Sequence, residues 1–98
     1  MRNSTFIIGL VLFELDISSA FSLKDKRRVL SSLKSQMKNK FNVAVSEVGD
    51  KDVWNRSVLA VTTVSDSRRL VDEVLQKIIN FVDNFHEINI LKMHEEIL

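Results

Sequence analysis

The sequence predicts one α+β domain with the element order strand, helix, strand, strand, helix, strand, and three observations predict it. Two long segments carry apolar residues at spacings of three and four, the period of a helix with one buried face. Four shorter segments are apolar or β-branched, as strands are. The chain has 98 residues, 45% of them hydrophobic, with no proline and two glycines, which fits a single domain over residues 1–98 without linkers.

The first half of the chain is expected to form a strand, a helix and a second strand. Residues 6–17 are apolar at first and then alternate in polarity, as a strand with two unlike faces does. Ser22 is expected to begin the helix, because it lies three residues before Asp25 in a close relative of the capping box. The helix should end near Asn39. Residues 41–48, rich in valine, form the second strand.

The second half repeats this pattern in the order strand, helix, strand. Residues 58–64 are β-branched and predict the third strand. Ser65 or Asp66 is expected to cap the second helix, which carries apolar residues at helical spacing. Residues 88–93 predict the fourth strand, with an extension to Ile97 left open.

Two strand–helix–strand units joined by a hairpin give the ferredoxin-like βαββαβ arrangement. Right-handed crossovers then place the strands antiparallel in the order 4-1-3-2, with both helices on one face of the sheet. In this topology the first helix begins at the edge of the sheet where the second strand ends. The loop of residues 49–55 should therefore lie beside the start of the first helix.

Positive charge is concentrated in the first helix. Seven of the fourteen basic residues fall between Lys24 and Lys40, where Asp25 is the only acid. A helix start favours anions, so a bound phosphate would stabilise these cations. A solvated helix face explains them equally well. Together with the neighbouring loop, the predicted nucleic-acid-binding residues are Lys24, Lys26, Arg27, Arg28, Lys51, Trp54 and Arg56.

Trp54 has two compatible interpretations. Between Lys51 and Arg56, an exposed indole would stack on a base while the cations hold phosphates. Alternatively, Trp54 packs over the second strand or the first helix and closes the hairpin. The binding mode of RNA-recognition motifs is excluded, because it needs aromatic residues on both central strands and residues 58–64 contain none.

The face of the sheet away from the helices is expected to be apolar in part. If Phe13 and Leu15 point toward the helices, then Ile8, Leu10 and Leu12 point the other way. Uncovered apolar patches commonly mark interfaces. These three residues are therefore predicted to form an interface, either in a homodimer or with another protein.

The sequence resembles the YlxP-like family of small bacterial proteins over nearly its whole length. The strongest matches are three segments: residues 22–28 (SLKDKRR), 41–49 (FNVAVSEVG) and 52–56 (DVWNR). Asp25, Val53 and Asn55 stand where the family commonly has Glu, Leu and Gln. The resemblance implies the ferredoxin-like fold and a genomic setting among translation and ribosome-maturation factors. It implies no reaction and no site residues.

No catalytic, metal or cofactor motif is present in the sequence. His86 and His94 lie eight residues apart, no cysteine accompanies them, and two isolated glycines build no phosphate loop. The apolar run at residues 6–13 is shorter than the ~20 residues that cross a bilayer. We therefore expect a non-catalytic, cytoplasmic accessory protein that binds RNA or the ribosome. A protein-interaction or homodimerising module is the alternative.

Overall fold

The order of elements and the sheet topology agree with the prediction. The structure, a computed structural model, describes residues 4–98, so residues 1–3 of the predicted domain lie outside the described part. The strands pair antiparallel in the order β2-β3-β1-β4, which is the predicted ferredoxin-like order. The elements are β1 (Ile7–Asp16), α1 (Leu23–Lys40), β2 (Ala44–Gly49), β3 (Arg56–Ser65), α2 (Arg68–Asp83) and β4 (Asn89–Ile97).

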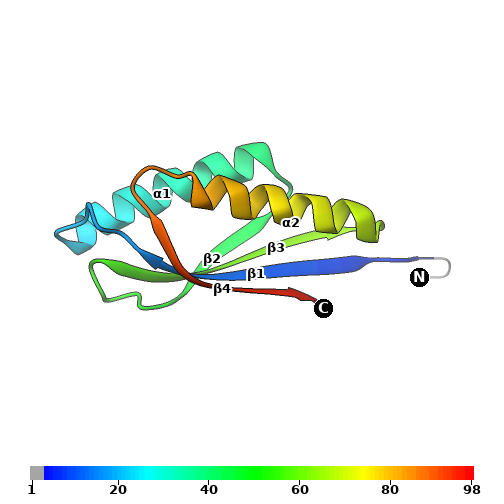
Figure 1. Ribbon diagram of the computed structural model, residues 1–98, viewed down its shortest axis with the longest axis horizontal. Coiled ribbons are helices and arrows are strands. Elements are labelled where there is room, and N and C mark those ends of the chain that lie inside the picture. Colours follow the sequence, from blue (N-terminus) through cyan, green and yellow to red (C-terminus); the bar gives the residue numbers. More distant parts are fainter. Residues whose placement is uncertain (1–3) are drawn as a thin grey trace.

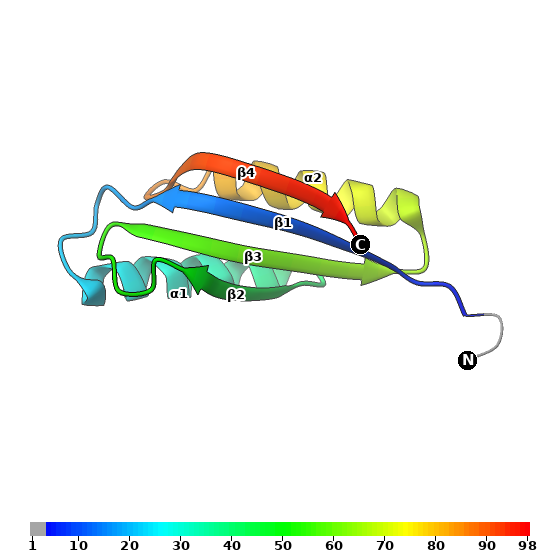
Figure 2. The ribbon, with the colours of Figure 1, turned by 90° about the horizontal axis from the view of Figure 1, so that it is seen from below.

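The two helices form a layer on one face of the sheet and leave the other face open (Figure 1). Seen from below, β1 and β3 lie in the middle of the sheet, with β2 and β4 at its edges (Figure 2). The core fills the space between the two layers. Its fully buried members on the sheet include Val11, Phe13, Leu15, Leu59 and Val61, and those on the helices include Val29, Leu33, Met37, Val71, Leu75, Ile78 and Val82.

Gly9 allows α2 to pack directly on β1. A Cβ atom built at Gly9 would lie 2.6 Å from Val71 Cγ1 and 2.9 Å from Leu75 Cδ1. Both distances are shorter than real Cβ contacts, so a larger residue at Gly9 would require the Val71 and Leu75 side chains to shift.

The predicted ends of two elements were wrong. Ser67, and not Ser65 or Asp66, caps α2, with its hydroxyl accepting from the Leu70 amide at 3.3 Å. The reason is that β3 continues through Ser65, where it still pairs with β1. Phe41, predicted to open β2, is instead the C-cap of α1, and its amide donates to the Met37 carbonyl at 2.9 Å.

The two faces of β1 differ as the alternation predicts. Val11, Phe13 and Leu15 are buried under the helices, whereas Leu10 and Leu12 on the open face are half-buried. Within residues 4–98, neither helix is both long and apolar enough to cross a membrane.

Candidate nucleic-acid interface

The start of α1 is fixed by a reciprocal pair of hydrogen bonds. The Ser22 hydroxyl accepts from the Asp25 amide at 3.0 Å, and the Asp25 carboxylate accepts from the Phe21 amide at 3.0 Å. This is the predicted relative of the capping box, with the carboxylate reaching one residue further back. Asp25 also places negative charge at the positive end of the helix dipole. The backbone of Phe21 is held in place as a result.

Lys26 is not available to a nucleic acid, which corrects the sequence-based expectation. Its side chain is only 1% exposed, and its Nζ atom lies 3.0 Å from Glu47 Oε2. The same Nζ atom donates to three backbone carbonyl oxygens: those of Asp50 at 2.8 Å, Lys51 at 3.1 Å and Arg56 at 3.1 Å. A buried ammonium is tolerated only when it is paired and hydrogen-bonded in this way.

The contacts of Lys26 attach the β2–β3 loop to α1. Asp50 adopts a positive φ of 57°, and its carbonyl accepts both from Lys26 and from the Val53 amide at 3.0 Å. Glu47, the ionic partner of Lys26, also accepts from the Ser57 hydroxyl at 2.7 Å. The loop and the start of α1, which are 24 to 30 residues apart along the chain, therefore form one rim of the molecule.

Two further predicted cations are paired, which again corrects the expectation of a fully free cluster. Arg28 lies 3.6 Å from Glu87, and Arg56 lies 3.7 Å from Asp16. Both arginine side chains are at least half exposed. Exposed pairs of this length contribute about 1 kcal/mol or less. Their charge is reduced at the rim, although the guanidinium groups remain accessible.

The other three predicted cations are exposed and unpaired. Lys24, Arg27 and Lys51 are all exposed, and none of them forms an ion pair within residues 4–98. Lys24 and Arg27 come from the first two turns of α1, while Lys51 comes from the loop that Lys26 holds. These three side chains are the unpaired cations of the rim, whose segments also carry the carboxylates of Asp25, Asp50 and Asp52.

An exposed aromatic pair lies at the same rim. Phe21 and Trp54 are 82% and 45% exposed, and their rings stack with centroids 6.4 Å apart and an interplanar angle of 20°. Trp54 thus neither packs into the core nor stands alone. Phe21 was missed by the sequence-based prediction. A hydrophobic residue just before an N-cap commonly packs against the fourth residue of the helix. In this chain the fourth residue is the charged Lys26, so Phe21 lacks that apolar partner. The sequence therefore did indicate an exposed Phe21.

The basic surface continues along α1 beside the edge strand β2. A cavity of about 480 Å³ lies between these elements, and its lining includes the cations Arg27, Lys34 and Lys38. Ser31 and Ser35 supply hydroxyl groups between them. Glu47, the acid in the lining, is the carboxylate already paired with Lys26. The α1–β2 flank therefore extends the positive surface of the rim.

No metal-binding constellation accompanies this surface. Among residues 4–98, no group of three or more His, Cys, Asp or Glu side chains lies close enough to hold a metal ion. The rim offers ammonium, guanidinium and aromatic groups together with the carboxylates of Asp25, Asp50 and Asp52.

Comparison with known proteins places the chain in a family. Residues 8–95 match the family described as a protein of unknown function, DUF503. The chain belongs to this family. It is also 42% identical over 82 residues to the uncharacterized protein YlxP of Bacillus subtilis (strain 168), covering 84% of this chain and 89% of that protein. The family assignment agrees with the resemblance seen in the sequence.

A solved structure shares the fold. A C-terminal segment of the alpha subunit of aIF2 from Pyrococcus abyssi superposes with a TM-score of 0.51 and 13% sequence identity. The match covers 99% of this chain and 52% of that chain, so this chain spans about half of that structure. At this identity the similarity supports the ferredoxin-like fold.

Proposed function

We propose that the protein is a non-catalytic accessory factor that binds RNA, as free structured RNA or in the ribosome, in the cytoplasm. One observation carries the proposal. The exposed Phe21–Trp54 stack lies at the same rim as the unpaired cations Lys24, Arg27 and Lys51. Aromatic rings beside cations are the combination that binds unpaired bases and the adjoining phosphates.

The free protein leaves both the aromatic pair and the unpaired cations of the rim in contact with solvent. The exposed rings interact only weakly with water, whereas the stacking of one base on an aromatic side chain contributes roughly 1–3 kcal/mol to the free energy of binding. Unpaired cations at a helix start lie where the helix dipole already favours an anion. Phosphate contacts would release counterions, so binding should weaken steeply as salt rises. The rim is held in a fixed shape by Lys26, which reduces the ordering needed on binding.

Binding to ribosomal subunits and to structured RNA, measured across a salt series, tests the proposal. The wild-type protein is compared with Arg27→Glu, which reverses an exposed charge at the rim and leaves the Lys26 contacts intact. We expect affinity that falls with salt and a further loss in the variant. Absence of binding even at low salt would rule the proposal out. A pull-down from cells at two salt concentrations extends the same comparison to unknown partners.

The open face of the sheet supports a second candidate, a homodimerising module. Ile8, Leu10 and Leu12 of β1 are half-buried and alternate with residues buried under the helices. They therefore lie on the face of the sheet that the helices leave open (Figure 1). Their β3 partners are Val64, Thr62 and Ala60, so a small apolar surface spans the two central strands. Packing of this surface against a second copy would remove it from water.

Light scattering of the wild type and of Leu10→Asp distinguishes the two candidates. A dimer that the substitution converts to a monomer, in a protein that binds no RNA at low salt, would favour the second candidate. A wild-type monomer at all concentrations would exclude self-association through this face.

A further inference from the structure

A larger groove, shallow and open to solvent, lies on the opposite flank of α1, between α1 and α2. Its volume is about 780 Å³, within the ~300–1,000 Å³ of small-molecule sites. Three phenylalanines line it: Phe41 at the end of α1, Phe81 in α2, and Phe85 just after α2. The Phe81 ring lies 6.0 Å from each of the other two, at 80° to Phe41 and 57° to Phe85. We refer to this groove as the aromatic groove.

The polar groups around the aromatic groove are cationic or neutral. Lys40 and Lys77 line it, and neither forms an ion pair within residues 4–98. No acidic residue is among the lining residues. Lys40 Nζ lies 5.0 Å from the centre of the Phe81 ring, so an ammonium group already rests against the aromatic surface. The groove is therefore complementary to an anion that carries a flat apolar body.

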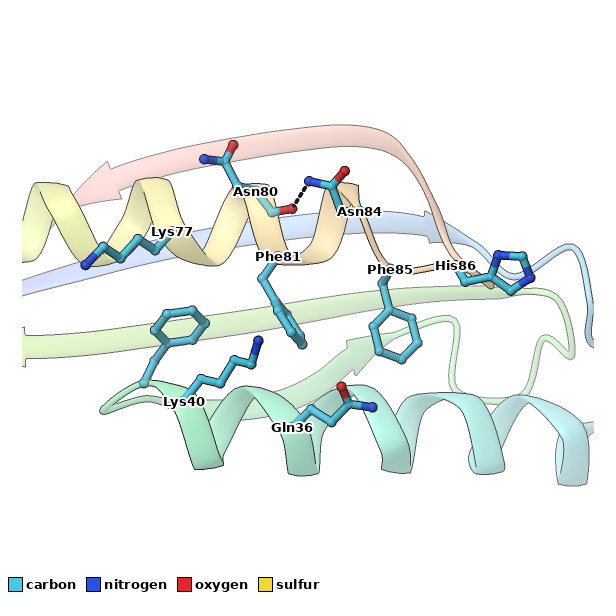
Figure 3. Close-up of a pocket in the computed structure, with 9 residues that line it drawn as sticks. Gln36, Lys40, Lys77, Asn80, Phe81, Asn84, Phe85 and His86 are labelled. Carbon is cyan, nitrogen blue, oxygen red and sulfur yellow. Dashed lines mark hydrogen bonds between the residues drawn. The ribbon is translucent and has the colours of Figure 1, made fainter.

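The directions of the side chains agree with this assignment. Phe81 and Phe85 project from the α2 side toward α1, and Lys40 lies between the helices close to Phe81 (Figure 3). Asn80 and Asn84 lie on the other side of α2, where the Asn84 amide donates to the Asn80 carbonyl at 2.8 Å (Figure 3). The Phe81 and Phe85 rings, the Lys40 ammonium group and the Gln36 amide thus face the space between the helices, whereas Lys77 extends along α2 at one end of the groove (Figure 3).

We propose that the aromatic groove binds a nucleoside phosphate. The base packs against Phe81 and Phe85, and Lys40 moves off the Phe81 ring, which it covers in the free protein, to hold the phosphate with Lys77. Stacking on phenylalanine is tolerant of base identity because every base has a flat face, and an ammonium group is a common phosphate partner. The nucleotide is either free or one unit of an RNA strand. The groove shares no residue with the rim, so this proposal is independent of the proposed RNA contact.

Chemical-shift mapping of the ¹⁵N-labelled full chain tests the proposal with three probes: adenosine 5′-monophosphate, adenosine and ribose 5-phosphate. We expect saturable shifts confined to residues 36–41 and 77–86 with the nucleotide. Adenosine should bind more weakly, and ribose 5-phosphate should give no saturable shifts. Equal binding of ribose 5-phosphate and the nucleotide, or no binding at millimolar concentration, would overturn the assignment.

Two variants measure separately what the Phe81 ring and the Lys77 charge contribute to nucleotide binding. Phe81→Leu keeps an apolar side chain but removes the stacking surface, and should weaken the nucleotide about tenfold. Lys77→Gln changes an exposed side chain and should weaken the nucleotide severalfold while leaving adenosine unchanged. Lys38→Gln, on the other flank of α1, is the control and should change neither. If Lys77→Gln and Lys38→Gln behave alike, the groove does not hold the phosphate.

The binding of a short oligonucleotide distinguishes a groove that binds a free nucleotide from one that binds a unit of an RNA strand. If the groove serves RNA, a uridine tetranucleotide should bind more tightly than the mononucleotide and shift both the groove and the rim. If it serves a free nucleotide, the tetranucleotide should bind no better. Arg27→Glu should leave mononucleotide binding unchanged in either case. A loss of mononucleotide binding in Arg27→Glu would overturn the groove assignment and leave the rim proposal standing.

Discussion

Both helices carry cations in their first turns, and the comparison between them shows why a count of charges misleads. In α2, Arg68 lies 3.4 Å from Asp72 and Arg69 lies 2.9 Å from Glu73, each pair one helical turn apart. Such pairs are typical of a solvated helix face. The charge at the start of α2 is therefore largely neutralised by the helix itself.

The start of α1 has no such internal neutralisation. Lys24 and Arg27 have no acidic partner within residues 4–98, whereas Lys26, between them, is buried and paired with a strand residue. Adjacent residues of similar type thus have different roles. Lys26 builds the rim, and its neighbours present charge to solvent.

Substitution of Lys26 should have the largest effect in this comparison. Lys26→Met removes the ammonium group that neutralises Glu47 and donates to the carbonyl oxygens of Asp50, Lys51 and Arg56. Loss of one member of a buried pair lowers the free energy of unfolding by about 3–5 kcal/mol. Urea denaturation measures this change. The control Lys24→Met, two residues away and exposed, should stay within about 0.5 kcal/mol of the wild type. Equal effects of the two substitutions would show that the buried contacts do not stabilise the fold.

Substitution of Trp54 should have the next largest effect, and on binding more than on stability. Trp54→Ala removes one ring of the exposed stack with Phe21. Loss of one stacked base weakens RNA binding by roughly 1–3 kcal/mol. Titration of RNA at fixed salt measures this, and Trp54→Phe, which keeps an aromatic ring, should retain much of the affinity. If Trp54→Ala binds like the wild type, the aromatic pair is not a stacking surface.

Removal of one charge from each helix tests whether an unpaired cation in α1 contributes more to RNA binding than a paired cation in α2. Arg27→Gln should weaken RNA binding and reduce the slope of log K against log salt by about 0.7–0.9, the value for one phosphate contact. Arg69→Gln removes the same charge from the other helix and should leave the slope unchanged, because Arg69 is already paired with Glu73. Equal slopes for the two variants would mean that only net charge matters.

Loss of the ion pair between Arg69 and Glu73 in α2 should have the smallest effect on stability and on RNA binding. Glu73→Gln frees Arg69 and should lower stability by about 0.5 kcal/mol or less, as expected for an exposed pair one turn apart. RNA affinity should hardly change, because no exposed aromatic stack is found at that end within residues 4–98. A large gain in affinity would show that any free cation on this protein creates a binding surface.

The sequence predicted the fold well because its periodicities are strong and local. Alternation in β1 and the apolar stripe of α1 specified which faces are buried, and handedness rules supplied the strand order. The N-cap of α2 was misplaced because the end of β3 is set by pairing with β1 at Ser65. Pairing of this kind is a tertiary contact that local sequence does not encode.

The candidate site was predicted less well, although one missed signal was in the sequence. Lys26 lies three residues after Leu23 and four before Leu30, so it falls on the buried stripe of α1. Glu47, two residues after Val45, falls on the inward face of β2. A lysine and a glutamate on facing buried surfaces indicate an internal ion pair. By contrast, the pairing of Arg28 with Glu87 depends on how the α2–β4 loop meets α1, which no local pattern reveals.

The position of Lys26 also has a consequence for how the chain folds. Two carbonyl groups of the β2–β3 loop and that of Arg56 at the start of β3 accept hydrogen bonds from one side chain of α1. The β2–β3 hairpin is therefore expected to be less stable before α1 docks. Early docking of α1 would then be a condition for forming the adjacent edge of the sheet. In native-state hydrogen exchange, these two segments should open together as one cooperative unit.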